Sequence, residues 1–307
     1  MDRLEAMAIL LKVVDKGGFS AASRDLGVPL ATVSRKVSEL EVHLGTKLLV
    51  RTTRKIAVTD AGNTYIAAAR RILAEVEETE KIAAGEFHSP RGEIILTAPL
   101  LFGRLHMLPI IAEFLAVYPE IDVRLLLSDR NLHLIEDHVD MAVRIGRLPD
   151  SMMIGTRVGS MRTVVCVSPT LLAERHVPQS PEDLANLPCV NFEPLSPTST
   201  WLFRSKDGAS TVDQPIRPRL SVTTAEAAVW SAIEGVGATR VLQYQCAAAV
   251  QEKSLQIILA EFEVEALPVH LLHAGRGSLP SKMRVFLEFA ASRLRWRLSS
   301  RERLSEP

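Results

Sequence analysis

The chain has 307 residues, of which 47% are apolar and 23% are charged, and its formal net charge is zero. This length and composition are typical of an ordinary soluble protein with two or three compact units. No apolar run approaches the roughly 20 residues that a membrane-spanning helix needs, and the acidic N-terminus does not fit a signal peptide. We therefore expect a cytoplasmic protein with no membrane partner.

The zero net charge conceals a basic N-terminal region. Residues 1–58 contain ten lysines and arginines against six aspartates and glutamates, an excess of four positive charges. Binding to a polyanion depends on local charge, so the neutral total does not argue against a nucleic-acid partner.

Three short helices are predicted at the start of the chain. Residues 3–15 have apolar side chains at helical spacing and are followed by two glycines. Ser20 is expected to be the N-cap of a second helix that ends at Gly27. Pro29 fits the first turn of a third helix, where its missing N–H costs little. The pattern predicts a helix-turn-helix, which presents its last helix to the DNA major groove.

The third helix has one apolar face and one exposed polar face. Its apolar stripe consists of Val33, Val37, Leu40 and Leu44. Ala31 and Arg35 are predicted on the opposite side, with Thr32 and Ser38 beside them. Arginine can bond guanine O6 and N7 together, and threonine or alanine can contact a thymine methyl group. The residues of the second and third helices that we expect at the DNA are Ser20, Pro29, Thr32, Ser34, Arg35 and Lys36.

Residues 47–58 predict a β-hairpin wing, because two short apolar runs flank a basic tip. Arg51 and Arg54 are predicted DNA-binding residues that reach phosphates or a narrow minor groove. Lys47 and Lys55 are expected to provide only general attraction to phosphate.

Thr59 is expected to cap a long helix that runs to about Gly85. Apolar or small residues alternate at intervals of four and three, which suits a seam between two helices. These seam residues are Tyr65, Ala69, Ile72, Val76, Thr79 and Ala83. Such a helix has little to bury in a monomer, and pairing would place two reading heads side by side. We predict a homodimer through this linker helix (residues 59–85), followed by a hinge over residues 86–92.

Beyond the hinge, predicted strands alternate with helices, which favours α/β layers with mainly parallel sheets. The expected strands are residues 94–96, 121–127, 141–145, 163–167 and 268–272. One helix is expected after Gly103, and three more are expected over residues 132–138, 225–234 and 282–293. The last strand is expected to return to the first lobe, which gives lobe I (93–162 and 268–300) and lobe II (163–267).

Many of these motifs together resemble the LysR-type transcriptional regulators. In the N-terminal region they are Ser20-Ala21-Ala22, Val33-Ser34-Arg35, Leu40-Glu41, Leu44-Gly45, Leu48-Leu49, Arg51, Arg54 and Thr59-Asp60-Ala61-Gly62. In the remainder they are residues 97–103, 127–130, 140–146, 148–151 and 201–203, which are similar to regulators of aromatic-acid and efflux genes.

This resemblance implies a fold that is α/β overall. The expected parts are a winged helix-turn-helix (1–58), a dimerisation helix (59–85) and a two-lobed effector-binding domain like periplasmic binding proteins (93–307). The implied function is sequence-specific binding of double-stranded DNA, controlled by a small-molecule effector between the lobes. The family also implies a homotetramer.

By the same resemblance, both lobes line the effector site. The expected residues are Pro99, Leu100, Leu101, Arg144, Gly146, Thr223, Thr224, Gly237 and Ala238. The chain departs from the family at Leu101, where a hydroxyl is usual, and at Thr239–Leu242, where a small residue and a proline are usual. Both changes imply a more apolar or differently shaped pocket. A carboxylate effector is compatible with Arg144 and the helix N-terminus after Pro99 as charge partners.

Other classes of function fit the sequence less well. An enzyme is disfavoured, because the sequence has no nucleophile elbow, phosphate loop, dinucleotide fingerprint or His-Glu-x-x-His pair; no cofactor and no metal site are expected. Cys166, Cys189 and Cys246 are expected to be reduced and mostly buried. A solute-binding protein would need an export signal, and an architectural DNA protein would not need a two-lobed sensor. The remaining alternative is a cytoplasmic small-molecule-binding protein with little sequence-specific role on DNA.

Overall fold

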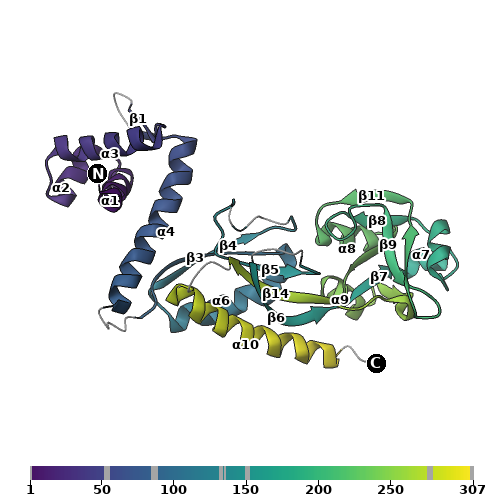
Figure 1. Cartoon of the computed structure of the whole chain (residues 1–307). Helices are drawn as coiled ribbons and strands as arrows, with labels where there is room; N and C mark the ends of the chain where they lie inside the picture. The colour runs from purple at the N-terminus through teal and green to yellow at the C-terminus, as the bar shows by residue number, and fades with distance from the viewer. Residues whose placement is uncertain are drawn as a thin grey trace. The chain divides into compact units, whose positions relative to one another are not determined.

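The structure, a computed structural model, describes residues 2–51, 56–83, 89–130, 134, 136–148, 153–274 and 279–304. The chain divides into two compact units, residues 1–89 and 90–307 (Figure 1). Each unit has its own hydrophobic core.

Three helices build the core of the N-terminal unit: α1 (Arg3–Asp15), α2 (Phe19–Leu26) and α3 (Leu30–Leu44). Asp2 caps α1, because its carboxylate accepts hydrogen bonds from two N–H groups of the first turn. The buried side chains of the three helices form one cluster: Ala6, Ile9, Leu10, Val13, Ala22, Val33, Val37 and Leu40. The predicted helix over residues 3–15 is confirmed, as is the apolar stripe of α3, although Leu44 is 37% exposed.

The second helix begins two residues before the predicted position, and the third begins one residue after it. Gly18 is the N-cap of α2, so the prediction of Ser20 as N-cap was wrong. Phe19 is already helical there and packs against the core, which favours the earlier start. Pro29 is the N-cap of α3 rather than a member of its first turn. Its carbonyl accepts hydrogen bonds from the N–H groups of Thr32 and Val33, and its missing N–H leaves no donor unsatisfied.

A hairpin of β1 (Leu49–Arg51) and β2 (Ile56–Val58) confirms the predicted wing. Arg54 and Lys55 lie outside the described residues, and so does the side chain of Arg51. The chain continues into α4 (Asp60–Ala83), which forms one long rod (Figure 1). Thr59 caps α4 as predicted, because its Oγ1 accepts a hydrogen bond of 2.9 Å from the N–H of Gly62. The same hydroxyl donates to the carbonyl of Lys47, which ties α4 to the wing.

Gly62 allows α4 to approach the wing closely. A Cβ atom at this position would lie 2.1 Å from the carbonyl oxygen of Leu48 and 2.8 Å from a methyl group of Val58. We expect Gly62→Ala to lower the free energy of unfolding by about 1–3 kcal/mol, because backbone must move to admit the methyl group. Urea unfolding monitored by circular dichroism measures this loss. Asn63→Ala, at an exposed neighbouring position, is the control, and equal midpoints for the two variants would contradict the close approach.

The predicted seam of α4 divides into two parts. Ala69 is 1% exposed and Tyr65 packs against the core of its own unit. Ile72 is 40% exposed, and together with Val76 and Thr79 it lines a shallow apolar depression on the helix surface. The first part of the seam therefore serves the N-terminal unit itself, and the second part is available to another chain.

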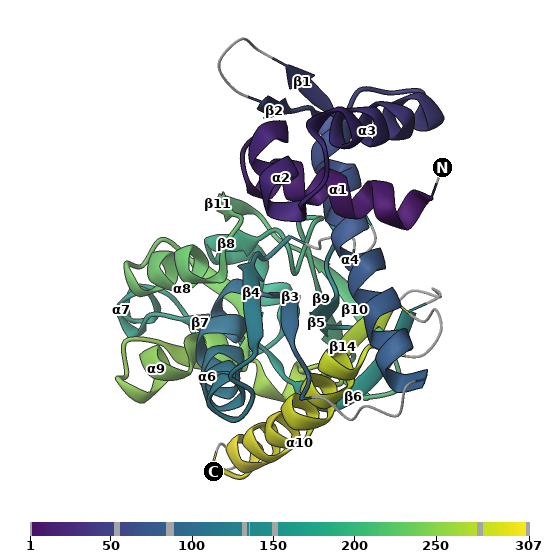
Figure 2. The ribbon, with the colours of Figure 1, turned by 90° about the vertical axis from the view of Figure 1, so that its left-hand side faces the viewer.

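Lobe I of the C-terminal unit is built on a five-stranded sheet of order β4-β3-β5-β14-β6 (Figure 2). Its strands are β3 (Gly92–Ala98), β4 (Ile121–Leu127), β5 (Met141–Ile145), β6 (Met153–Met161) and β14 (Leu267–Ala274). The helices that share its main core are α5 (Leu100–Phe102), a π-helical turn (Gly103–Met107), α6 (Leu108–Val117) and α10 (Ser281–Leu304). The carboxyl ends of the parallel strands β3, β4 and β5 lie at one edge of this sheet.

Lobe II is built on a sheet of order β11-β8-β12-β7-β13. Its strands are β7 (Thr163–Val167), β8 (Cys189–Phe192), β11 (Pro218–Val222), β12 (Ala238–Leu242) and β13 (Gln256–Ile258). The other elements are α7 (Pro169–Ala173), α8 (Ala225–Ile233), α9 (Gln243–Gln251), the short 3-10 helices Pro181–Asn186 and Ala260–Phe262, and the hairpin β9 (Thr200–Arg204) with β10 (Thr211–Pro215). One face of the sheet packs on α8 and α9, and the other packs on the hairpin through Trp201 and Phe203.

All five predicted strands of this unit are confirmed, and the three cysteines are buried free thiols as expected. The sheets are mixed rather than mainly parallel, because two of the four strand pairings in each sheet are antiparallel. The predicted helix over residues 132–138 was wrong for its described residues, 134 and 136–138, which form turns. His138 has a φ of 53°, which no right-handed helix accommodates.

One apolar helical segment is longer than the sequence led us to expect of any apolar run in the chain. Residues Leu100–Val117 are long and apolar enough to cross a membrane by length and composition alone, with a mean hydropathy of 1.7. In the structure 44% of the segment is buried. Phe102, Ile110 and Phe114 lie in the core of lobe I, so the segment is a core helix of this lobe.

Two strands carry the chain between the lobes, and they are hydrogen-bonded neighbours. β6 leads from lobe I into β7, and β14 returns, with Met161 paired to Leu267. Close to this crossing, Nε and Nη2 of Arg162 donate to the carboxylate of Glu263, at 2.8 and 2.9 Å. This bidentate ion pair joins the outgoing and the returning segment, so it lies where any change of angle between the lobes must occur.

Candidate nucleic-acid interface and effector site

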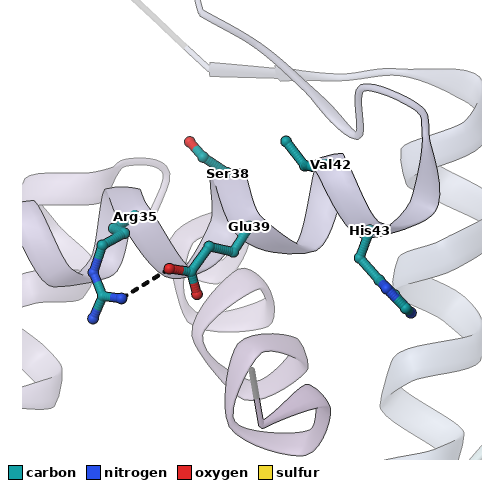
Figure 3. A pocket seen from close by; sticks show the side chains of 5 residues that line it. All are labelled: Arg35, Ser38, Glu39, Val42 and His43. Atoms are coloured by element: carbon teal, nitrogen blue, oxygen red, sulfur yellow. Dashed lines mark hydrogen bonds and ion pairs between the residues drawn. The ribbon is translucent and has the colours of Figure 1, made fainter.

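Arg35 lies on the exposed face of α3 and is more exposed than Lys36, the next residue of that helix. Its side chain is 62% exposed, and its Nη1 lies 2.8 Å from Oε1 of Glu39, one turn further along the same helix (Figure 3). The guanidinium therefore lies on the surface of α3 and is not packed into the fold. An arginine held in this way keeps its hydrogen-bonding edge available to an external acceptor.

The other predicted residues of the helix-turn-helix occupy different positions. Thr32 and Ser34 are half-buried on α3 beside Arg35, and Ser20 and Pro29 are exposed near the starts of α2 and α3. Lys36 forms an ion pair with Glu5 of α1, and its side chain is only 16% exposed. The structure thus brings Thr32, Ser34 and Arg35 to neighbouring positions on α3 and holds Lys36 against another helix.

The turn between α2 and α3 is fixed by local contacts. Gly27 has a φ of 67°, a left-handed conformation that favours glycine, and ends α2. The hydroxyl of Ser23 donates to the carbonyl of Val28 at 2.6 Å. Hydrogen bonds from Lys12 and Lys16 lower the pKa of Asp25 to about 2, so this carboxylate remains charged and joins α2 to α1. These contacts set the direction of α3.

Glu41 of α3 holds the wing, a role that sequence reasoning missed. Its side chain is buried, and its Oε1 accepts hydrogen bonds from the N–H groups of Leu48 and Leu49 at 3.0 and 3.1 Å. Burial raises the pKa of the Glu41 carboxyl, but the Lys47 ammonium at 2.7 Å and the two N–H groups outweigh burial and keep this pKa below its ordinary value. The sequence did contain one signal for this role: Glu41 directly follows Leu40, a member of the buried apolar stripe of α3.

The lobe I part of the predicted effector site follows β3. Pro99 and Leu100 are half-buried, whereas Leu101 is 6% exposed and belongs to the lobe I core. The N–H of Leu100 donates to Oδ1 of Asp129 at 3.0 Å. The first donor of this short helix is therefore already used by a carboxylate of the chain itself.

Arg144 and Gly146 lie at the end of β5. Arg144 is half-buried beside its strand neighbour His270, and burial lowers the pKa of its guanidinium. It lies on the sheet face opposite the one that packs on α6, because Val143 belongs to the main core. Gly146 has a φ of 125°, which excludes most other residues, and its N–H donates to the carbonyl of Pro268.

The predicted lobe II residues lie at opposite ends of the sheet. Thr223 and Thr224 follow the carboxyl end of β11, and the Thr224 hydroxyl caps α8. Gly237 and Ala238 are at the start of β12, where Ala238 pairs with Cys189, the first residue of β8. The strand register therefore places Ala238 about four residues, or ~13 Å, from the end at which Thr223 lies.

Direct contacts join the two lobes near Pro99 and Thr224. Arg104, just after α5, lies 3.0 Å from Glu226 in the first turn of α8. Tyr244 of lobe II packs edge-on against Phe102 and His106 of lobe I, with ring centroids 5.8 and 5.6 Å apart. The described residues include no group of His, Cys, Asp or Glu suited to a metal ion.

Both units match known protein families. Residues 4–63 match the bacterial regulatory helix-turn-helix protein of the lysR family, and residues 87–295 match the LysR substrate binding domain. An HTH-type transcriptional regulator from Xanthomonas campestris pv. campestris is 34% identical over 289 residues, covering 93% of this chain and 84% of that protein. An HTH-type transcriptional repressor from Pseudomonas aeruginosa is 30% identical over 289 residues, covering 94% and 91%.

A solved structure is similar over both units. CrgA, a LysR-type transcriptional regulator from Neisseria meningitidis, superposes with a TM-score of 0.60 and is 30% identical, covering 94% of this chain and 98% of that chain. The chain belongs to the LysR family of transcriptional regulators. It is a DNA-binding regulator with a helix-turn-helix and an effector-binding domain, from a family of regulators rather than enzymes.

Proposed function

We propose that α3 reads base pairs in the major groove and that Arg35 is its principal base-reading residue, with Thr32 and Ser34 beside it. The exposure of Arg35 carries this proposal, because its partner Glu39 is a surface residue of the same helix. Turning the guanidinium towards guanine O6 and N7 leaves no buried group unpaired. Ser20, Pro29 and Lys36 are assigned to the adjacent backbone, although Lys36 must first leave Glu5. Arg51 and Arg54 of the wing are assigned to phosphates or the minor groove.

Footprinting on the DNA upstream of the protein's own gene tests the proposal. We expect a protected site with two-fold-related halves, because the half-sites of a dimer follow the symmetry of the protein. Gel shifts with unrelated DNA of the same length provide the control. Equal affinity for both DNAs would overturn the proposal and favour a cytoplasmic small-molecule-binding protein with little sequence-specific role on DNA.

The functional unit is a homodimer through the accessible part of the α4 seam, and two dimers form a tetramer. Ile72 and Val76 support this part of the proposal, because an exposed apolar stripe on a long helix gains by pairing with its own copy. The regulator works in the cytoplasm, where its DNA is.

A small molecule, in this proposal an anion, binds between the lobes and changes their relative angle. Pro99, Leu100, Arg144 and Gly146 contribute from lobe I, and Thr223 and Thr224 from lobe II. Leu101, Gly237 and Ala238 stay predictions, and their positions favour supporting roles in the core and in the strand register. Arg144 supplies the positive charge in lobe I, because the helix donor after Pro99 is used by Asp129.

We expect Arg144→Ala to weaken binding of small aromatic carboxylates about 10- to 100-fold, because a charge-assisted pair is lost. DNA affinity without ligand should stay unchanged. Calorimetry with sodium benzoate and sodium salicylate measures the first effect, and gel shifts measure the second. Arg147→Ala, at an exposed neighbouring position, is the control. Equal ligand affinities for the Arg144 variant and wild type would remove Arg144 from the site.

A further inference from the structure

Lobe II buries an arginine without burying an acid beside it. Arg240 of β12 is 9% exposed, and its Nη1 donates a long hydrogen bond of 3.5 Å to the hydroxyl of Ser196. Among the residues that the structure describes, no carboxylate forms an ion pair with it. Burial lowers the pKa of Arg240 to about 10, with no nearby acid acting against that shift. The side chain is therefore charged at neutral pH, and its burial without an ion-pair partner lowers the stability of the fold.

Other buried polar groups lie on the same sheet face and lack partners. Arg240 pairs across β7 with Val165, and Leu242 pairs with Thr163, so these four side chains share one face. The Oγ1 of Thr163 is buried, and none of the described residues forms a hydrogen bond with it. Asn191 donates from Nδ2 to the carbonyl of Ser196 at 3.0 Å, while its buried Oδ1 has no partner within the described parts of the chain. Buried polar groups are normally satisfied, so this cluster lacks a hydrogen-bonding companion.

The cluster lies at the end of lobe II that faces lobe I. Leu242, two residues after Arg240, packs in the core cluster of lobe I together with Tyr244. The next N–H, that of Gln243, donates to the carbonyl of Arg162 at the crossing between the lobes. A group bound at Arg240 would therefore act on β12, which contacts lobe I through Leu242 and leads directly into Gln243 and Tyr244.

We propose that Arg240 and the hydroxyl of Thr163 form an anion-binding subsite in lobe II that takes the carboxylate of a small organic acid. This inference rests on the proposed effector function and assigns to its anion a contact in lobe II. The guanidinium offers two parallel donors to a carboxylate, and the hydroxyl offers a third. The opposing explanation is structural: Arg240 and Asn191 would serve only to hold the turn at Ser196.

Stability and ligand response separate these two explanations. The experiment uses the full-length protein, wild type and Arg240→Met, with the exposed Arg219→Met of the same sheet as the matched control. Thermal unfolding is followed with and without sodium acetate, sodium benzoate and sodium salicylate, and with benzamide as the uncharged counterpart of benzoate. Arg240→Lys keeps the positive charge but loses the two parallel N–H donors of the guanidinium.

We expect Arg240→Met to unfold at the same or a higher temperature than wild type without ligand, since it removes an unpaired buried charge. At least one carboxylate should raise the unfolding temperature of wild type and Arg219→Met, with benzamide inactive. Its affinity should fall about 10- to 100-fold in Arg240→Met and less in Arg240→Lys. A lower unfolding temperature for unliganded Arg240→Met, equal carboxylate shifts with and without Arg240, or no carboxylate shift in wild type would each overturn the subsite.

Gel shifts on the same preparations keep the two proposals distinguishable. Arg240→Met should bind the upstream DNA as wild type does. Equal binding of the upstream and unrelated DNA by wild type would overturn the proposed mode of DNA reading. The unfolding data alone test the Arg240 subsite.

Discussion

Arg35→Ala should relax sequence preference at one base pair of each half-site. If the contact to guanine is bidentate, its loss costs about 1–3 kcal/mol at that position, or about 5- to 140-fold in affinity. Affinity for sites that already carry a different base pair there should change little. Competition gel shifts against operators substituted at each position measure this profile.

Two further variants give the Arg35 prediction its controls. Arg35→Lys keeps the charge but loses the two-pronged geometry, so it should also lose selectivity. Arg51→Ala in the wing should weaken all sequences alike and make the salt dependence less steep, as expected for a phosphate contact. Identical selectivity profiles for Arg35→Ala and Arg51→Ala would contradict the assignment of base reading to α3 and of backbone contacts to the wing.

Charging the exposed seam of α4 should separate the dimer. In the double variant Ile72→Glu with Val76→Glu, the carboxylates of two chains would meet in an apolar contact. Burying these like charges there is too costly for the contact to form. Each head would then bind its half-site alone, and operator affinity should fall about 100- to 10,000-fold through the loss of bivalency. Sedimentation velocity measures the assembly, and gel shifts measure the affinity.

Glu77→Gln supplies the comparison for this double variant. Position 77 is on the same helix but about 100° or more around it from Ile72, Val76 and Thr79, so its substitution should leave assembly unchanged. A double variant that still sediments as the wild-type oligomer would show that α4 does not hold the chains together.

Elements with strong local signals could be predicted closely from the sequence. The strand over residues 121–127 has the predicted bounds, since an apolar run between turn residues leaves little choice. Helix starts were less predictable. Ser20 is a good capping residue by type, but the packing of Phe19 decides where α2 begins. The mixed sheets depend on how β6 and β14 cross between the lobes, which is a long-range property that no local pattern contains.

The candidate sites follow the same distinction. The exposed face of α3 follows from helical periodicity and is visible in the sequence, whereas the Lys36–Glu5 ion pair depends on how α1 packs. Gly237 was predicted in the effector site, but a Cβ there would lie 2.5 Å from the carbonyl oxygen of Pro188, so close backbone packing explains the glycine. Arg240 could not be singled out, because a strand arginine becomes informative only when its burial and its missing acid are known.

The position of β14 has a consequence for synthesis of the protein on the ribosome. β14 lies between β5 and β6 in the lobe I sheet, yet it is translated after the whole of lobe II. The roughly 105 residues between β6 and β14 take about 5–20 s to translate at ~5–20 residues per second. During that interval β5 has an unpaired edge and β6 has no partner in this sheet, which invites association between nascent chains on neighbouring ribosomes. The DNA-reading head and most of lobe II are thus complete before lobe I can close.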